Sequence, residues 1–270
     1  GNPKLNLAFV ANLFNTHPGL EPLSQEELAA LDSSLFNSEG SREARAFCLW
    51  INSLGIEPFV NNLFEDLRDG IIILKVMDIV QPGIVDWSKV NTKEPLNKFK
   101  KVENCNYAVV LGKQMKFSLV GIAGSDIHDG NQTLTLALVW QLMRAHVISI
   151  LKGLGENVDE NMMVKWANEQ VSQSGKSSKM ANFKDASLRT SHFFLDLLNT
   201  IKKCVDYNIV TPGESDEDAL LNAKYTISIA RKLGCTIFLL PEDIIEVKHK
   251  MILTLVGSIM SVAIANKGSH

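Results

Sequence analysis

The sequence lacks a strong excess of charge of either sign. Its 27 lysines and arginines and its 30 aspartates and glutamates leave a formal net charge of −3 at pH 7. Proteins that bind nucleic acids usually carry a basic domain or a basic stripe, so the composition does not favour a nucleic-acid partner. Any attraction to an acidic surface must come from local clusters of basic residues.

Cysteine pairs are also missing from the sequence. The four cysteines, at positions 48, 105, 204 and 235, lie far apart, and none forms a CxxC motif. Scattered single cysteines are typical of buried thiols in a reducing compartment rather than of disulfides or zinc sites. We therefore expect a cytoplasmic protein that holds no metal or other cofactor.

Two further absences limit the fold class and the location. The apolar run 134–151 contains Gln141, Arg144 and His146, and the run 251–265 is about 15 residues long where a membrane span needs roughly 20. Both runs predict buried helices, and no membrane partner is expected. Strict alternation of apolar and polar residues is absent, with segment 236–240 as the one weak exception.

Helical patterns are present instead. Apolar residues at i, i+3, i+4, i+7 and i+10 predict an amphipathic first helix, and they are Ala44, Phe47, Cys48, Ile51 and Leu54. Asp66 and Asp69 are expected to cap the next helix, and further helices are predicted at about 101–113 and 132–152. A capping box at 24–27 predicts a short helix at 25–31. The predicted fold class is all-α.

The chain repeats itself at a spacing of between 116 and 120 positions. Segment 49–52 is similar to segment 165–168, segment 85–87 to 205–207, and segment 125–127 to 242–244. Asn106 and Tyr107 are matched by an asparagine and a tyrosine within segment 222–225. Such a period predicts two units of the same plan, separated at about 148–155.

The first fourteen residues add a partial third copy. Segments 1–14 and 130–143 are identical at seven of fourteen positions. We therefore predict that residues 1–40 contain the end of a preceding repeat and a linker. The first complete domain is predicted at 41–152 and the second at 157–266, while residues 267–270 resemble an artificial remnant.

The first complete repeat resembles a calponin-homology domain. The resemblance rests on segments 47–52, 66–70, 104–108, 119–122 and 126–131, which occur in the order typical of that domain. The second repeat keeps Trp166, Asn168, Asp243 and Ile244, but it has Ser187 to Ser191 in place of Asp66 to Gly70. We expect Ser187 to cap the helix at this point. Segments 102–108, 116–122 and 130–143 are similar to the third repeat of the fimbrin/plastin family.

The resemblance to fimbrins and plastins implies a function. It implies two tandem calponin-homology helical domains that bind filamentous actin as a monomer, in the cytoplasm and on the actin cytoskeleton. The parent protein would crosslink filaments into bundles, and these residues would form its second actin-binding pair. The EF-hand region of the family is not among these residues, so calcium control is not expected to reside here.

The resemblance also places actin contacts on two helices of the first domain, to which we add a lysine-rich connection. The candidates are Arg42, Arg45, Leu49, Asn52, Lys89, Lys98, Lys100, Lys101, Gln132, Thr133, Thr135, Leu136, Val139, Gln141 and Arg144. The helix predicted at 132–152 is apolar nearly all round, which is typical of full burial or of a helix shared between a core and a partner. Without the resemblance, the basic residues would be interpreted as solvated surface.

Two other functions compete with actin binding. Gly175-Lys176-Ser177 is similar to the end of a phosphate-binding loop, but Gln170 stands where that loop needs a glycine. No nucleophile, base and orienting group occur together, so we expect no enzymatic activity. The second alternative is a calponin-homology module that binds microtubules or a signalling partner, although such modules are typically single domains.

Overall fold

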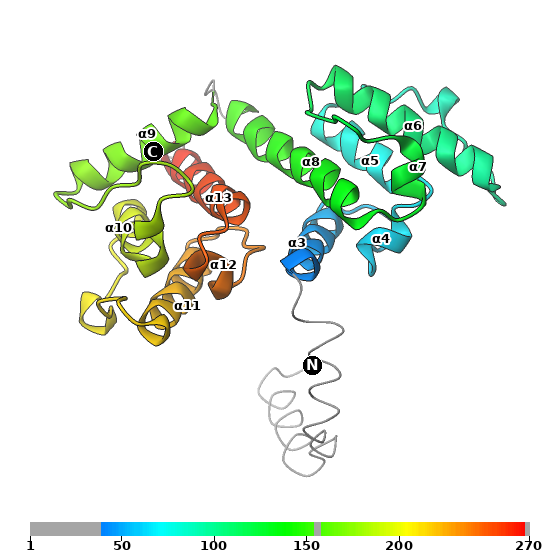
Figure 1. Cartoon of the computed structure of the whole chain (residues 1–270). Coiled ribbons are helices and arrows are strands. Elements are labelled where there is room, and N and C mark those ends of the chain that lie inside the picture. The colour runs from blue at the N-terminus through cyan, green and yellow to red at the C-terminus, as the bar shows by residue number, and fades with distance from the viewer. Residues whose placement is uncertain (1–38, 154–157, 268–270) are drawn as a thin grey trace, which may run out of the picture. The chain divides into compact units, whose positions relative to one another are not determined.

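The computed structural model describes residues 39–153 and 158–267, and every regular element in these residues is a helix (Figure 1). The all-α fold class predicted from the sequence is confirmed. The first repeat contains α3 (Glu39–Ser53), α4 (Leu63–Asp66), α5 (Ile71–Val80), the 3-10 helix η2 (Trp87–Lys89), α6 (Lys98–Gln114), α7 (Gly124–His128) and α8 (Gln132–Gly153). The second contains α9 (Glu160–Gln173), η3 (Ala186–Thr190), α10 (His192–Ile201), η4 (Tyr207–Ile209), α11 (Asp216–Lys232), α12 (Pro241–Ile245) and α13 (His249–Lys267).

The two repeats share helix order, and three pairs of equivalent helices have the same length. Helices α5 and α10 have 10 residues each, α6 and α11 have 17 each, and α7 and α12 have 5 each. Asparagine side chains occupy equivalent positions within the first long helix of each repeat. Asn52 accepts a hydrogen bond from the backbone N of Val60 and donates one to its carbonyl, both at 2.8 Å. Asn168 makes the same pair of bonds to Met180, at 2.9 and 2.8 Å.

A second buried asparagine ties three segments together in each repeat. Asn104, which is 1% exposed, donates to the carbonyls of Asp69 and Asn91 and accepts from the backbone N of Asn91. Asn222 bonds in the same way to Thr190 and Thr211. Because a buried amide without partners is costly, these bonds fix α5 and α10 against α6 and α11.

The sequence comparison of the two repeats was wrong by two positions here. It matched Asn106 with Asn222, whereas the hydrogen bonds match Asn104 with Asn222. The tyrosines confirm the corrected register. The hydroxyl of Tyr107 accepts from the backbone N of Asp86 at 3.0 Å, and that of Tyr225 accepts from the backbone N of Asp206 at 2.8 Å.

Other local predictions also need correction. Ser187 does not cap its helix, because Asp185 is the N-cap of η3 and accepts from the backbone N of Ser187. Asp66 is the last residue of α4, and only Asp69 contacts the start of α5, where it accepts from the N of Ile71 at 2.9 Å. Segment 236–240 forms no strand. The helix predicted at 25–31 and the partial repeat at 1–14 lie outside the described residues.

The long apolar helices α8 and α13 pack against one another. Gly257 of α13 allows the close approach, since a Cβ added there would lie 2.4 Å from Cγ1 of Val147. Both helices contribute side chains to the core, with Leu138 and Val256 fully buried. Both are also long and apolar enough to cross a membrane. This is only weak evidence for a membrane span, because core helices of soluble proteins meet the same criterion.

Candidate functional site

The start of α6 presents a cluster of lysines. Asn97 caps the helix by accepting from the backbone N of Lys100 at 2.9 Å. Lys98 and Lys100 are exposed, whereas Lys101 is half-buried. Phe99, between the two exposed lysines, is itself 71% exposed. The first turn of α6 therefore combines positive charge with an exposed aromatic ring.

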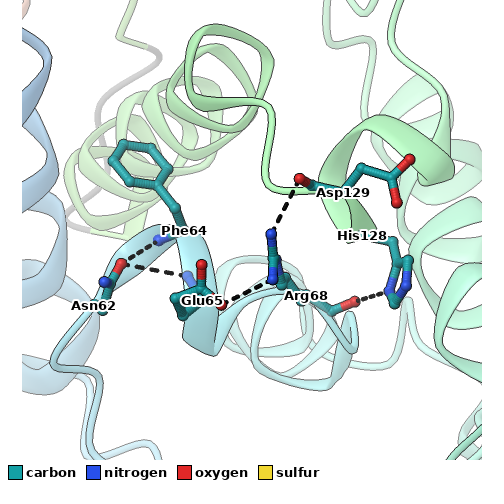
Figure 2. Close-up of polar contacts among 6 residues, drawn as sticks. All are labelled: Asn62, Phe64, Glu65, Arg68, His128 and Asp129. Atoms are coloured by element: carbon teal, nitrogen blue, oxygen red, sulfur yellow. Dashed lines mark hydrogen bonds and ion pairs between the residues drawn. The ribbon is translucent and has the colours of Figure 1, made fainter. Parts of the chain in front are cut away.

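Arg68 connects α4 to the turn that precedes α8 (Figure 2). Its guanidinium donates to Glu65 at 2.9 Å and to the backbone carbonyl of Asp129 at 3.1 Å, while its own carbonyl accepts from Nδ1 of His128 at 3.1 Å. Gly130 follows with a φ of 77°, and a Cβ there would lie 2.8 Å from the Arg68 guanidinium. These contacts fix the turn that precedes α8, and Lys98 pairs with the Asp129 carboxylate in the same turn, at 3.6 Å.

The candidate residues of α8 divide into exposed and buried sets. Gln132 and Thr133, at its start, are exposed. Thr135, Leu136 and Val139 are 1%, 8% and 1% exposed, so in this structure they are buried rather than open to a partner, contrary to the surface position that a contact residue needs. At helical spacing they lie on the face that carries the core residues of α8. The sequence prediction did not separate the exposed face of the helix from its buried face.

Two candidates further along α8 are engaged within the chain. The Gln141 amide accepts from the backbone N of Ser118 at 2.6 Å and donates to the Ser118 carbonyl at 2.8 Å. Arg144 forms an ion pair with Glu160, in the first turn of α9. Gln141 therefore holds the 115–122 connection against α8, and Arg144 links the first repeat to the second.

The candidates on α3 have different surroundings. Leu49 is 57% exposed and Arg45 is exposed, whereas Arg42 is half-buried. Asn52 is committed to Val60, as described above, so its role is structural. Neighbouring Trp50 is buried and donates from Nε1 to Nδ1 of His146 on α8, at 3.2 Å.

Lys89 lies in η2 and forms a local ion pair with Asp86 at 3.1 Å. Hydrogen bonds from Ser88 and Lys89 lower the pKa of Asp86, and the bond to Asp86 raises the pKa of Lys89. Both groups are exposed. In the described part of the chain, no hydrogen bond or ion pair joins Lys89 to the lysines of α6.

Several exposed apolar residues of the first repeat were missed by the sequence analysis, among them two valines and a phenylalanine. Val120 is 89% exposed, Phe99 71% and Val110 50%. Val120 lies in the 115–122 connection, which Gln141 holds against α8. Phe99 could have been found from its position between two lysines, whereas nothing in the local pattern distinguishes Val110 or Val120 from core valines.

Three kinds of polar group relevant to catalysis can be located in the described residues. Within residues 39–153 and 158–267, no three His, Cys, Asp or Glu side chains are grouped to hold a metal ion. Burial raises the pKa of the Cys48 thiol to about 11 and that of Cys105 to about 12, which disfavours the nucleophilic thiolate. Lys176, in the segment similar to a phosphate loop, lies 3.8 Å above the Tyr207 ring and pairs with Asp196.

Comparison with known proteins identifies the fold family. Residues 41–148 and 157–265 each match the calponin homology (CH) domain. The chain belongs to the calponin homology family. Both matched segments together cover most of the chain, so each of the two repeats is a CH domain of this family.

The resemblance to fimbrins and plastins is also confirmed. The chain is 52% identical to fimbrin of Schizosaccharomyces pombe, over 97% of this chain and 44% of that protein. It is 47% identical to human plastin-3, over 96% of this chain and 42% of that protein. A crystal structure of the actin-crosslinking core of S. pombe fimbrin matches with a TM-score of 0.76 and 51% identity, over 97% of this chain and 53% of that one. The chain thus spans about half the length of these relatives, or less.

Proposed function

We propose that the chain binds filamentous actin through its first CH repeat, and that it is part of a larger protein that crosslinks filaments into bundles. The proposal is supported by the similarity to fimbrins, one of which is described as having an actin-crosslinking core. Residues 41–152 form the binding domain, 157–266 a divergent second domain, and 1–40 the end of a preceding repeat with a linker. The chain acts as a monomeric cytoplasmic binding module on the actin cytoskeleton rather than as an enzyme.

The observation that carries the proposal is the charge at the start of one helix. In the first repeat, α6 begins with Lys98, Phe99 and Lys100 after its cap at Asn97. In the second repeat, the equivalent helix α11 begins with three acidic residues, Asp216, Glu217 and Asp218, after its cap at Ser215. Acidic residues are favourable at a helix N-terminus, and lysines are unfavourable there by about 0.3–1 kcal/mol each.

The lysines of α6 therefore act against the stability of their own helix. A partner with an acidic surface, such as actin, compensates for this cost when it binds. Basic residues also speed the encounter with an acidic partner and make binding salt-dependent. The second repeat keeps the arrangement that favours its own stability, which supports the assignment of actin binding to the first repeat.

The binding surface consists of the exposed candidates together with the apolar residues that accompany them. It comprises Arg45, Leu49, Lys98, Phe99, Lys100, Val120, Gln132 and Thr133. Arg144 joins this surface only after it leaves Glu160, so loosening of the contact between the repeats would favour binding. Thr135, Leu136 and Val139 support the surface from the core.

The test is cosedimentation of the chain with filamentous actin at high and at low centrifugal force, over a range of salt concentrations. We expect the chain to pellet with filaments at high force, and binding to weaken as salt rises. It does not gather filaments at low force, because bundling needs two binding units on one polypeptide. Cosedimentation with microtubules distinguishes the alternative partner. Pelleting with microtubules but not with actin would contradict the proposal.

A pair of matched variants locates the surface. Leu49→Asp places a charge on α3 where the side chain is 57% exposed, and Leu221→Asp makes the same change on α11 where it is 55% exposed. Neither change disturbs a buried side chain, so both variants should fold. We expect Leu49→Asp to weaken actin binding at least about tenfold and Leu221→Asp to leave it unchanged. Equal effects would remove α3 from the site.

A further inference from the structure

A small cavity lies where the two CH repeats meet. It has a volume of about 200 Å³, and its walls come from α3 and α8 of the first repeat and from segment 236–238 and α13 of the second. Gly257 brings α13 against Val147 of α8, and a Cβ at this position would overlap Cγ1 of that valine. Ser258 and Ser261, the next residues of α13 on the cavity wall, are too small to fill the space beside this contact.

One polar group in the cavity wall has a defined hydrogen-bonding state. Nδ1 of His146 accepts a hydrogen bond from Nε1 of buried Trp50 at 3.2 Å. A neutral imidazole whose Nδ1 accepts must carry its proton on Nε2. Burial lowers the pKa of His146, so the ring is neutral near pH 7. Among the described residues, no protein group accepts a hydrogen bond from this Nε2–H group. His146 lines the cavity.

The remaining wall defines the ligand that would fit. Large apolar side chains dominate, with Leu54, Met143, Val147, Ile150 and Phe238 around Trp50. No Asp, Glu, Lys or Arg side chain lines the cavity, so a charged ligand would be left without a counter-ion, which is strongly unfavourable. An apolar cavity of roughly 150 Å³ is large enough for benzene. The present cavity therefore has room for one or two fused rings.

We propose that this cavity is a binding site for a small, uncharged aromatic heterocycle whose ring nitrogen accepts a hydrogen bond from Nε2 of His146. The aromatic rings pack between Trp50 and Phe238. Because both repeats contribute walls, the bound ligand contacts both and stabilises their pairing. The site is separate from the surface that we assign to actin.

The test uses isoquinoline as the probe and the whole chain as the protein. Naphthalene has the same shape without the acceptor nitrogen, so it is the matched control ligand. We expect one isoquinoline to bind per chain with a Kd on the order of 0.1–1 mM, measured by chemical-shift changes in two-dimensional NMR. Naphthalene should bind about three- to tenfold more weakly, because it lacks one hydrogen bond.

Three variants separate this site from nonspecific binding. Ser261→Leu fills the cavity and should weaken isoquinoline binding at least about tenfold, whereas Ser172→Leu, at an exposed position of α9, should not. His146→Phe should remove the preference for isoquinoline over naphthalene and leave naphthalene binding in place. Thermal unfolding without ligand reports whether each variant folds, and wild-type chain should unfold at a higher temperature when isoquinoline is present.

Several results would overturn the proposal. They are an absence of isoquinoline binding by wild-type chain up to its solubility limit, equal binding by the Ser261→Leu and Ser172→Leu variants, and a preference for isoquinoline that survives His146→Phe. The test does not involve actin, so its failure would leave the proposed function unaffected.

Discussion

The two CH repeats differ in what fills the same surface groove. In the first repeat, a groove of about 890 Å³ is lined by Phe59, Arg68, Lys75 and Trp87 among others. In the second repeat, the groove beside Tyr207, which corresponds to Trp87, has a volume of about 550 Å³. Tyr207 and Trp87 both begin a 3-10 helix that an aspartate caps, so the positions are equivalent.

The smaller groove is occupied by side chains of the second repeat itself. Lys176 lies over the Tyr207 ring and pairs with Asp196, and Asp196 accepts hydrogen bonds from the hydroxyls of Tyr207 and Ser178, both at 2.7 Å. Lys75 stands at the fifth position of α5, where α10 has Asp196. The buried asparagines are shared by both repeats, whereas exposed side chains differ in charge and in contacts. The scaffold is therefore common, and the two repeats differ on its surface.

The largest expected effect concerns the residue before α5 and α10. Gly70 has a φ of 78°, and a Cβ there would lie 2.8 Å from the backbone N of Cys105. Ser191 occupies the equivalent position with a φ of 63°, and its buried hydroxyl has no hydrogen-bond partner. Gly70→Ser should lower the free energy of unfolding by about 2–4 kcal/mol, because of overlap and backbone strain. Ser191→Gly should raise it by about 1 kcal/mol.

Urea unfolding of both variants measures this difference. The two changes in the free energy of unfolding are expected to have opposite signs. This would show that the first repeat requires glycine at a position where the second tolerates a strained serine. If Gly70→Ser were as stable as wild type, the fit of α5 against α6 would not be as tight as described.

The next effect concerns the contact between the repeats. Gly257→Ala should cost about 1–3 kcal/mol, since its Cβ would overlap Val147. Gly153→Ala is the control, because nothing lies within 4 Å of a Cβ at that position of α8. We expect small-angle scattering to show a larger radius of gyration for Gly257→Ala only, and the additional change Val147→Ala to reverse part of the effect. An unchanged radius would mean that α13 does not depend on this close approach.

The smallest effect is a pH dependence confined to the first repeat. His146 is the fifteenth residue of α8, and the fifteenth residue of α13 is Ala263. Burial lowers the folded-state pKa of His146 below its ordinary value of 6.5. As the pH falls through 6.5, the unfolded chain takes up this proton before the folded chain does, so stability is lost. His146→Phe should therefore lose less stability than wild type between about pH 7.5 and about pH 5.5.

Urea unfolding at both pH values checks this prediction. Carboxylates contribute to the pH dependence of both proteins equally, so the comparison isolates the histidine. Identical losses in the two proteins would show that His146 titrates in the same way folded and unfolded.

Much of the fold was accessible from the sequence. The apolar stripe from Ala44 to Leu54 predicted α3. The repeated pattern of a tryptophan followed two residues later by an asparagine located Asn52 and Asn168, whose bonds to Val60 and Met180 are nearly identical. Such features depend on local spacing, which a sequence displays directly. The register between Asn104 and Asn222 was missed, because only the hydrogen bonds distinguish Asn104 from Asn106.

The candidate site was less accessible. An apolar helix such as α8 has no polar face to mark its orientation, so Thr135, Leu136 and Val139 were assigned to the surface although they are buried. The partners of Gln141 and Arg144 lie on other elements, at Ser118 and Glu160, and tertiary contacts of this kind leave no local signal. The exposed lysines of α6 were found because charge runs are visible in the sequence.

The most direct test of the difference between the repeats reverses charge at the start of the two equivalent helices. One variant carries both Lys98→Glu and Lys100→Glu, and a second variant carries Glu217→Lys. Actin cosedimentation and urea unfolding compare the two variants with the wild-type chain. We expect the double change at α6 to abolish binding while raising the stability of its helix by about 0.5–1 kcal/mol. Glu217→Lys should lower stability slightly and leave binding intact. Unweakened binding by the α6 variant, or loss of binding by Glu217→Lys, would contradict the assignment of actin binding to the first repeat.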